Sequence, residues 1–206
     1  MILQMKCYND FHMGIELKTW QSASLFTLQD VFYYSSHNLD KIESADLALR
    51  NLENIFSKLS ALVKENNFTQ LNIDNENIFL LTSMNAIKML NELLDTNRFT
   101  SLKTEIHNLL VNKQFNYGPK NIIEFGILGI IVRMYDKVAR LVNLITKADN
   151  LKDALTISTI KDESIIDTLF DIVGYCTMAL MIESKDSDFG NWFLFPFEDN
   201  EYVSLH

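Results

Sequence analysis

Two long apolar segments in the second half of the chain, residues 125–147 and 162–183, constrain the fold more than any other feature. Each has the length and composition of a helix, and each carries its charged residues on one stripe at about 100° per residue. The stripe of the first segment consists of Gly126, Gly129, Arg133, Asp136, Lys137, Arg140 and Lys147. The stripe of the second consists of Glu163, Asp167, Asp171, Gly174 and Met178. One helix therefore presents mostly cations, and the charges on the other are all carboxylates.

A helix that is apolar nearly all round is buried inside a protein, so both segments are predicted to lie in the core. Their charged side chains then face an interior interface or a cleft. Because an uncompensated buried charge costs several kcal/mol, these side chains need an ion pair, a hydrogen bond or a metal ion. The carboxylates of the second helix also repel one another, so a positive group is expected beside them.

Two interpretations account for this positive group. If residues 148–162 fold the two helices back antiparallel, the cations of the first helix lie beside the carboxylates of the second. The expected neighbours are Lys137 and Arg140 with Glu163 and Asp167, Arg133 with Asp171, and Gly126 and Gly129 with Gly174. In the first interpretation they form a structural ladder of ion pairs. In the second, the carboxylates bind hard divalent cations through oxygen, and the basic stripe binds phosphates that those cations bridge.

The segment before the basic helix favours an anionic ligand. Gly118 and Pro119 interrupt the helical pattern, because proline has a fixed φ and no N–H group. The loop is expected to bring Lys113, Tyr117 and Asn121 to the N-terminus of the basic helix, where helix N-termini attract anions. Residues 113–147 contain six lysines and arginines against two acids. A phosphate is therefore expected at this entrance.

The remaining sequence predicts further helices. Few glycines and prolines, six and two, favour long helices with few turns. Apolar residues that recur every three or four positions predict helices over 20–34, 44–64 and 77–95, and a capping Thr100 or Ser101 begins one that ends near Asn112. Residues 66–77 are expected to form a loop. Thr159 or Asp162 is expected to cap the acidic helix.

Composition excludes several classes of function. The net charge of −9 argues against polymeric nucleic acid or an anionic membrane as the main partner, although a basic cleft still suits a small anion. The N-terminus lacks the pattern of a signal peptide, and Asp171 interrupts the best candidate for a transmembrane span. Cys7 and Cys176 are expected to be free thiols in a reducing cytoplasm. The four histidines lack the spacing of a zinc site.

Residues 113–183 also resemble a known family. The resemblance is carried by Lys113, Tyr117-Gly118, Asn121-Ile122, Phe125-Gly126, Gly129, Arg133, Asp136-Lys137, Arg140-Leu141, Asp162-Glu163-Ser164, Asp167-Thr168-Leu169, Asp171 and Gly174-Tyr175. This pattern resembles the phage-associated nucleotide modification associated domain family, which is similar to the all-α MazG-type nucleoside triphosphate pyrophosphohydrolases. The resemblance implies a cytoplasmic, all-α bundle of about five to seven helices, located in the host cytoplasm if the chain is phage-encoded.

The resemblance further implies three regions: an N-terminal helical region of unknown role (1–110), a MazG-like helical domain (111–183) and an aromatic tail (184–206). It implies a homo-oligomer that binds Mg²⁺ and a nucleoside triphosphate and releases pyrophosphate by metal-assisted hydrolysis. The expected metal ligands are Glu163, Asp167 and Asp171, and the expected catalytic acids are Asp136, Glu163 and Asp167. The expected phosphate contacts are Arg133, Lys137 and Arg140, with Lys113, Tyr117 and Asn121 along the edge of the nucleotide.

The sequence departs from the MazG-type pattern at two places. The Glu-Glu-x-x-Glu motif is absent from the first helix, and Ser164 stands where the Glu of the Glu-x-x-Asp motif would be, three residues before Asp167. Fewer carboxylates hold fewer metal ions, so a non-catalytic alternative stays open. In that alternative the chain binds a nucleotide or a partner protein, and the same residues form an interhelical salt-bridge network.

Overall fold

A computed structural model describes residues 20–65, 72–73, 76–117, 122, 124–148, 151–157 and 164–183. Within these residues the elements are α2 (Trp20–Asn38), the short 3₁₀ helix η1 (Leu39–Lys41), α3 (Ala45–Lys64), β1 (Asn72–Ile73), β2 (Glu76–Asn77), α4 (Ile78–Leu93), α5 (Thr96–Tyr117), α7 (Gly126–Ile145), α8 (Leu151–Ile157) and α9 (Ile165–Glu183). The predicted all-α class is confirmed. The predictions for Cys7, Asn121, Glu163 and the aromatic tail fall outside the described residues.

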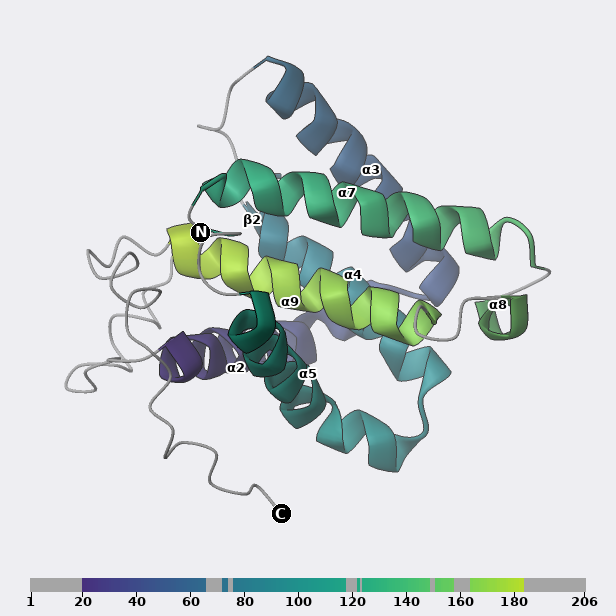
Figure 1. Ribbon diagram of the computed structural model, residues 1–206. Helices are drawn as coiled ribbons and strands as arrows, with labels where there is room; N and C mark the ends of the chain where they lie inside the picture. The colour runs from purple at the N-terminus through teal and green to yellow at the C-terminus, as the bar shows by residue number, and fades with distance from the viewer. Residues whose placement is uncertain are drawn as a thin grey trace.

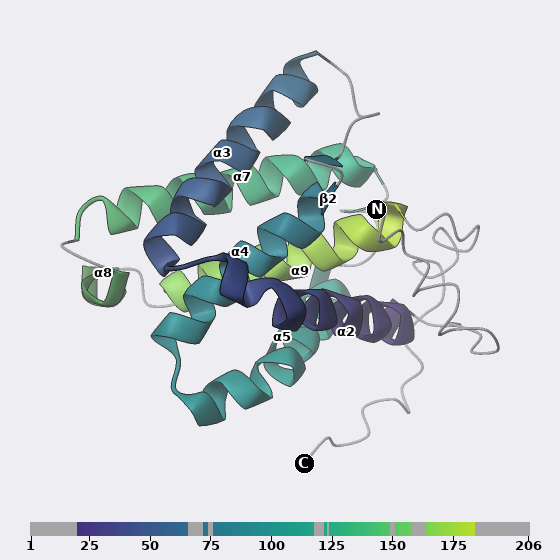
Figure 2. The ribbon, with the colours of Figure 1, turned by 180° about the vertical axis from the view of Figure 1, so that it is seen from behind.

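The helix α9 is the centre of the bundle (Figure 1). It packs against α4, α7, α2 and α5, and α4 in turn packs against α3 and α2. The view from behind shows α4 crossing the face of α9 that is hidden in Figure 1 (Figure 2). Most residues of α9 are buried, as its apolar sequence predicts. The two central helices thus come from opposite halves of the chain, and a single hydrophobic cluster contains residues from both.

The composition of α9 also satisfies the criterion for a membrane span. Among the described helices it is the one that is long and apolar enough to cross a membrane, but most of it is buried within the fold. Such burial is typical of a core helix. The predicted absence of a membrane span stays a prediction.

The prediction that the basic helix is buried all round is wrong. One face of α7 is buried through Ile130, Met134, Val138 and Leu141, whereas Val132 is 51% and Tyr135 49% exposed on the opposite side. The exposed side chains of Phe125 and Leu128 continue this apolar stripe. The reason is that α7 covers α9 and α3 from outside and has no helix on its outer face within the described residues.

The observed bounds differ from the predicted ones for two helices and one loop. The helix α2 ends at Asn38 and not at Tyr34, and α5 begins at Thr96, so the prediction that Thr100 or Ser101 caps it is wrong because both lie inside the helix. The helix α5 continues to Tyr117 because the first strong helix breaker after Asn112 is the pair Gly118-Pro119. Lys113 and Tyr117 are therefore held on a helix and not on a loop. Residues 72–77, expected to lie in a loop, include a short antiparallel strand pair in which Asn72 pairs with Asn77.

Glu183, the last residue of α9, is expected to make the stability of the fold depend on pH. The side chain of Asn77 caps α4 and donates a hydrogen bond of 2.7 Å to Oε2 of Glu183, the last residue of α9. Burial raises the pKa of the Glu183 carboxyl, and the hydrogen bond from Asn77 partly opposes this effect. Because the folded chain holds this proton more tightly than the unfolded chain, stability falls as pH rises between the unfolded and the folded pKa.

Glu183→Gln should therefore stabilise the protein at pH 7. The amide oxygen still accepts from Asn77, and removing a negative charge from a helix C-terminus alone contributes about 0.3–1 kcal/mol. Urea unfolding of both proteins at pH 4 and pH 7 measures the effect, which should be larger at pH 7. Equal gains at the two pH values would show that the charge of Glu183 is not the cause.

Candidate functional site

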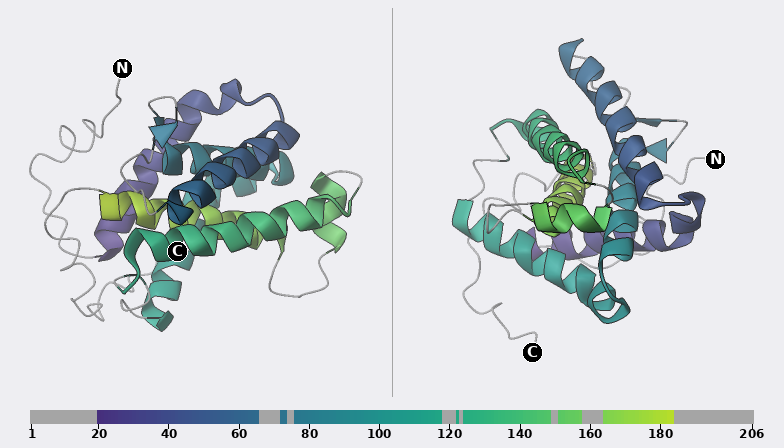
Figure 3. Two further views of the ribbon diagram at one scale, coloured as in Figure 1. Left: turned by 90° about the horizontal axis from the view of Figure 1, so that it is seen from above. Right: turned by 90° about the vertical axis from the view of Figure 1, so that its right-hand side faces the viewer.

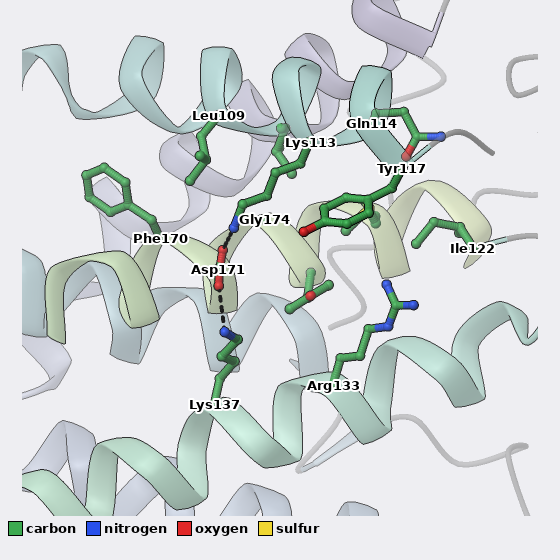
Figure 4. A pocket seen from close by; sticks show the side chains of 13 residues that line it. Leu109, Lys113, Gln114, Tyr117, Ile122, Arg133, Lys137, Phe170, Asp171 and Gly174 are labelled. Atoms are coloured by element: carbon green, nitrogen blue, oxygen red, sulfur yellow. Dashed lines mark hydrogen bonds and ion pairs between the residues drawn. The ribbon is translucent and has the colours of Figure 1, made fainter. Parts of the chain in front are cut away.

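The charged residues of α7 and α9 meet at Asp171, near the middle of α9. Its carboxylate is 11% exposed and binds two lysines, one through each oxygen (Figure 4). Oδ1 contacts Nζ of Lys113 on α5, and Oδ2 lies 2.9 Å from Nζ of Lys137 on α7. One buried carboxylate thus joins three helices, which satisfies the requirement that a buried charge be paired.

The contacts between α7 and α9 confirm that these helices run antiparallel, side by side (Figure 3). Lys137 lies beside Asp171, while Met134, earlier on α7, lies beside Cys176, later on α9, with 3.7 Å between the two sulfur atoms. The predicted register is wrong by about one turn, because Lys137 and not Arg133 pairs with Asp171. Cys176 is a buried free thiol, as predicted, and burial raises its pKa.

The glycine in the middle of α9 allows close approach of α5. A Cβ atom at Gly174 would lie 2.8 Å from Cδ2 of Leu110, so any larger residue requires this leucine to move. The predicted neighbours of Gly174 were Gly126 and Gly129 of α7, and the observed neighbour is instead Leu110 of α5. This close approach helps Lys113, one turn after Leu110 on α5, to reach Asp171.

The carboxylate of Asp167 has a different partner. Its Oδ2 accepts hydrogen bonds from the backbone N–H (3.0 Å) and the hydroxyl (2.6 Å) of Ser164, and the Ser164 hydroxyl oxygen accepts from the N–H of Asp167 (3.1 Å). This reciprocal arrangement is a capping box at the start of α9. The prediction that Thr159 or Asp162 caps this helix is therefore wrong, because Ser164 and Asp167 have the serine-x-x-acid spacing immediately before the apolar run.

A cavity of about 350 Å³ lies between α5, α7 and α9 beside the paired carboxylate. Its polar wall consists of Lys113, Gln114, Tyr117, Arg133, Lys137, Asp171 and Tyr175. Its apolar wall consists of Leu109, Leu110, Ile122, Phe170, Gly174 and Met178. The volume lies within the range of roughly 300–1,000 Å³ that is typical of small-molecule sites, which combine apolar walls with a few polar groups.

The charge of this cavity is positive. Three cations, Lys113, Arg133 and Lys137, line it together with one carboxylate, that of Asp171. Among the described residues the guanidinium of Arg133 has no hydrogen-bond or ion-pair partner, and it points from α7 toward Tyr117 (Figure 4). A guanidinium has five N–H donors in a planar fork that matches a phosphate or a carboxylate. The cavity therefore suits an anionic ligand with an apolar or aromatic part.

The structure brings only part of the predicted site together. Of the predicted residues, Lys113, Tyr117, Arg133, Lys137 and Asp171 line the cavity. Arg140 and the exposed Asp136 lie on α7 outside the cavity lining. Asp167 belongs to the capping box at the start of α9, and Glu163 and Asn121 lie outside the described residues.

No arrangement of described residues forms a metal site. Within the part of the chain that the structure describes, no group of three or more histidine, cysteine, aspartate or glutamate side chains is placed to hold a metal ion. Asp171 would bind a cation only in competition with its two lysines. Because Glu163 lies outside the described residues, the predicted Mg²⁺ site at Glu163, Asp167 and Asp171 stays a prediction.

Sequence reasoning missed the contribution of Gln114 and of the aromatic residues Phe170 and Tyr175. Gln114 is 6% exposed and lines the cavity from α5. A single glutamine near the end of a polar helix carries no signal in the sequence. Gln114 reaches the cavity because α5 continues to Tyr117, which the sequence did not predict.

Comparisons with protein-family models, with curated proteins and with solved structures found no match to this chain. The resemblance of residues 113–183 to the nucleotide modification associated domain family therefore stays a prediction. The residues that line the cavity and their geometry are the basis for any proposal about function.

Proposed function

We propose that the cavity between α5, α7 and α9 binds a nucleotide through its phosphate groups, with Arg133, Lys113 and Lys137 as the phosphate contacts. The observation that carries this proposal is the guanidinium of Arg133, which lines the cavity without a partner among the described residues. Each lysine ammonium has three donors. Lys113 therefore keeps donors for a ligand while it holds Asp171, and Lys137 places a second ammonium in the cavity lining.

The apolar residues that line the cavity support a nucleotide over a simple inorganic anion. Ile122, Phe170 and Met178 give the cavity an apolar surface, and Tyr117, which is 69% exposed, adds an aromatic ring to its lining. Apolar and aromatic side chains bind the faces of bases, and cations bind the phosphates. An acidic chain with net charge −9 that concentrates cations in one cavity is suited to a small anionic ligand.

Isothermal titration calorimetry of the full chain tests this proposal. We expect saturable binding of nucleoside triphosphates without added metal, with an affinity that falls as the salt concentration rises, because ion pairs to phosphate are screened. A panel of the common ribo- and deoxyribonucleotides identifies the preferred base and sugar. If no nucleotide binds at millimolar concentration, the proposal is wrong.

Mg²⁺-dependent hydrolysis to a monophosphate and pyrophosphate stays a prediction from the resemblance. It requires carboxylates that hold the metal and lower the pKa of an attacking water. Among the expected metal ligands, Asp167 lies on an exposed face of α9. Its carboxylate accepts two hydrogen bonds from Ser164. A homo-oligomer and a cytoplasmic location likewise stay predictions.

Paired variants separate a catalytic from a structural role of Asp167. If hydrolysis occurs, Asp167→Ala should abolish the release of pyrophosphate, whereas Ser164→Ala should retain most of it. Both variants break the same capping box and should lose about 1 kcal/mol of stability. Release of pyrophosphate is measured in an enzyme-coupled phosphate assay with Mg²⁺. Equal activity in the two variants would exclude Asp167 as a metal ligand.

The structural alternative also has support from one contact. The bridge from Lys113 through Asp171 to Lys137 is an interhelical salt-bridge network of the kind that the sequence allowed. In this role the network holds α5 and α7 on α9 without any ligand. The structural role and the proposed function predict different results for Arg133. Arg133 does not belong to the bridge, so in a purely structural role its substitution should leave the stability of the fold unchanged, whereas in the proposed function it should weaken nucleotide binding.

A further inference from the structure

The amide of Gln114 is an uncommon feature of the cavity wall. Its side chain is 6% exposed, yet within the described residues the amide has no hydrogen-bond partner. Within the described residues, the side-chain atoms that are sealed from solvent without a partner are Tyr34 Oη and Ser35 Oγ, so the donors and the acceptor of the Gln114 amide remain accessible. Gln114 lines the cavity, so the partner of its amide is expected to be a molecule that enters there.

Gln114 and the buried carboxylate lie toward opposite ends of the cavity. In the view of Figure 4, Gln114, Tyr117 and Ile122 are seen at one end, and Asp171 with Lys113 and Lys137 is seen at the other. Arg133 extends from α7 toward the end that contains Tyr117. Arg133 and Lys137 are neighbours on one face of α7, since residues four apart are one turn apart. A chain of phosphates can therefore reach from one end of the cavity toward the other.

We infer that Gln114 recognises the base of the bound nucleotide, with its amide against the hydrogen-bonding edge and Tyr117 against the base or its sugar. This inference rests on the proposed function and assigns a part of the ligand to the end of the cavity that contains no lysine. A glutamine amide has an acceptor and two donors, and it pairs in two-point fashion with a base edge that offers a donor beside an acceptor. The apolar side chain of Ile122, which is buried, adds contact area at the same end.

The comparison of a nucleoside triphosphate with inorganic triphosphate tests this inference, because both carry the same phosphate chain and only one carries a base. The wild-type chain should bind the nucleotide at least about tenfold more tightly than inorganic triphosphate. Gln114→Leu keeps the size of the side chain and removes its hydrogen bonds. In this variant the affinity for the nucleotide should fall to near that for inorganic triphosphate, and the affinity for inorganic triphosphate should not change.

The stability of the unliganded variant is a second readout that does not depend on the ligand. Because the amide of Gln114 has no partner among the described residues and is not sealed from solvent, Gln114→Leu should leave the melting temperature of the free protein nearly unchanged. A structural glutamine that holds the helices together would instead lower it. A lower melting temperature would therefore overturn the inference.

The outcomes distinguish this inference from the proposal on which it rests. If nucleotide and inorganic triphosphate bind equally well to the wild type, the phosphate site exists and the base site does not. If Gln114→Leu weakens both ligands by the same factor, Gln114 does not select the base, and the inference is wrong. If the wild type binds neither ligand, both the proposed function and the inference fail.

Discussion

Arg133→Ala should weaken nucleotide binding by about tenfold to a hundredfold. The guanidinium lines the cavity and has no partner among the described residues, so its removal costs no internal contact. Hydrogen bonds to charged groups contribute about 1.5–3 kcal/mol each, and 1.4 kcal/mol corresponds to a factor of ten in affinity. Titration calorimetry at one fixed salt concentration measures the change. The melting temperature of the free protein should be nearly unchanged.

Two further variants at α7 make this prediction specific. Arg140→Ala removes the same charge from the same helix outside the cavity lining, and it should change the affinity by less than about threefold, as expected of a distant screened charge. Arg133→Lys keeps the charge but loses the planar fork, so an intermediate affinity is expected. If Arg140→Ala weakens binding as strongly as Arg133→Ala, the long-range field of α7 and not the cavity attracts the ligand.

Phe79→Ala should cost about 3–5 kcal/mol in the free energy of unfolding. Phe79 is fully buried in the first turn of α4, the helix that packs against α9. It is among the largest buried side chains of the core. Since whole domains have about 5–15 kcal/mol of stability, this single change removes a large share of it. Urea unfolding followed by circular dichroism measures the loss as a lower midpoint.

A substitution of similar chemistry on the surface is the control for Phe79. Tyr33 on α2 is 61% exposed, so Tyr33→Ala should change the unfolding free energy by no more than about 1 kcal/mol. If the two variants lose similar amounts, the core does not lie where α4 meets α9. An unchanged midpoint for Phe79→Ala would contradict the observed packing in the same way.

The helices could be predicted from the sequence because their signals are local. The apolar period of three to four residues identified α3, α4, α7 and α9, and the lack of glycine and proline indicated an all-α fold. That the basic and the acidic helix meet through opposite charges could also be predicted, because buried charges must be paired. The sequence paired Asp171 with Arg133, however, and the structure pairs it with Lys137.

The details of the site could not be predicted, because they depend on contacts between distant residues. The register of α7 on α9 is one turn from the predicted one, and the contact of Met134 with Cys176 is part of the packing that determines it. No pattern in the sequence predicts that α5 lies against Gly174 and brings Lys113 to Asp171. The exposure of Val132 and Tyr135 likewise depends on which neighbours α7 lacks among the described helices.

Whether a nucleotide binds in the cavity between α5, α7 and α9 can be measured through the protection of its lysines from an amine-reactive label. The labelling is followed by mass spectrometry with and without a saturating nucleoside triphosphate. Lys113 and Lys137 line the proposed site, and the exposed Lys147, two residues after the end of α7, is the internal reference. We expect the nucleotide to slow the labelling of Lys113 and Lys137 by at least about threefold and to leave that of Lys147 unchanged, since bound phosphates cover the two ammonium groups. Unchanged labelling of Lys113 and Lys137 under saturating nucleotide would contradict nucleotide binding in this cavity.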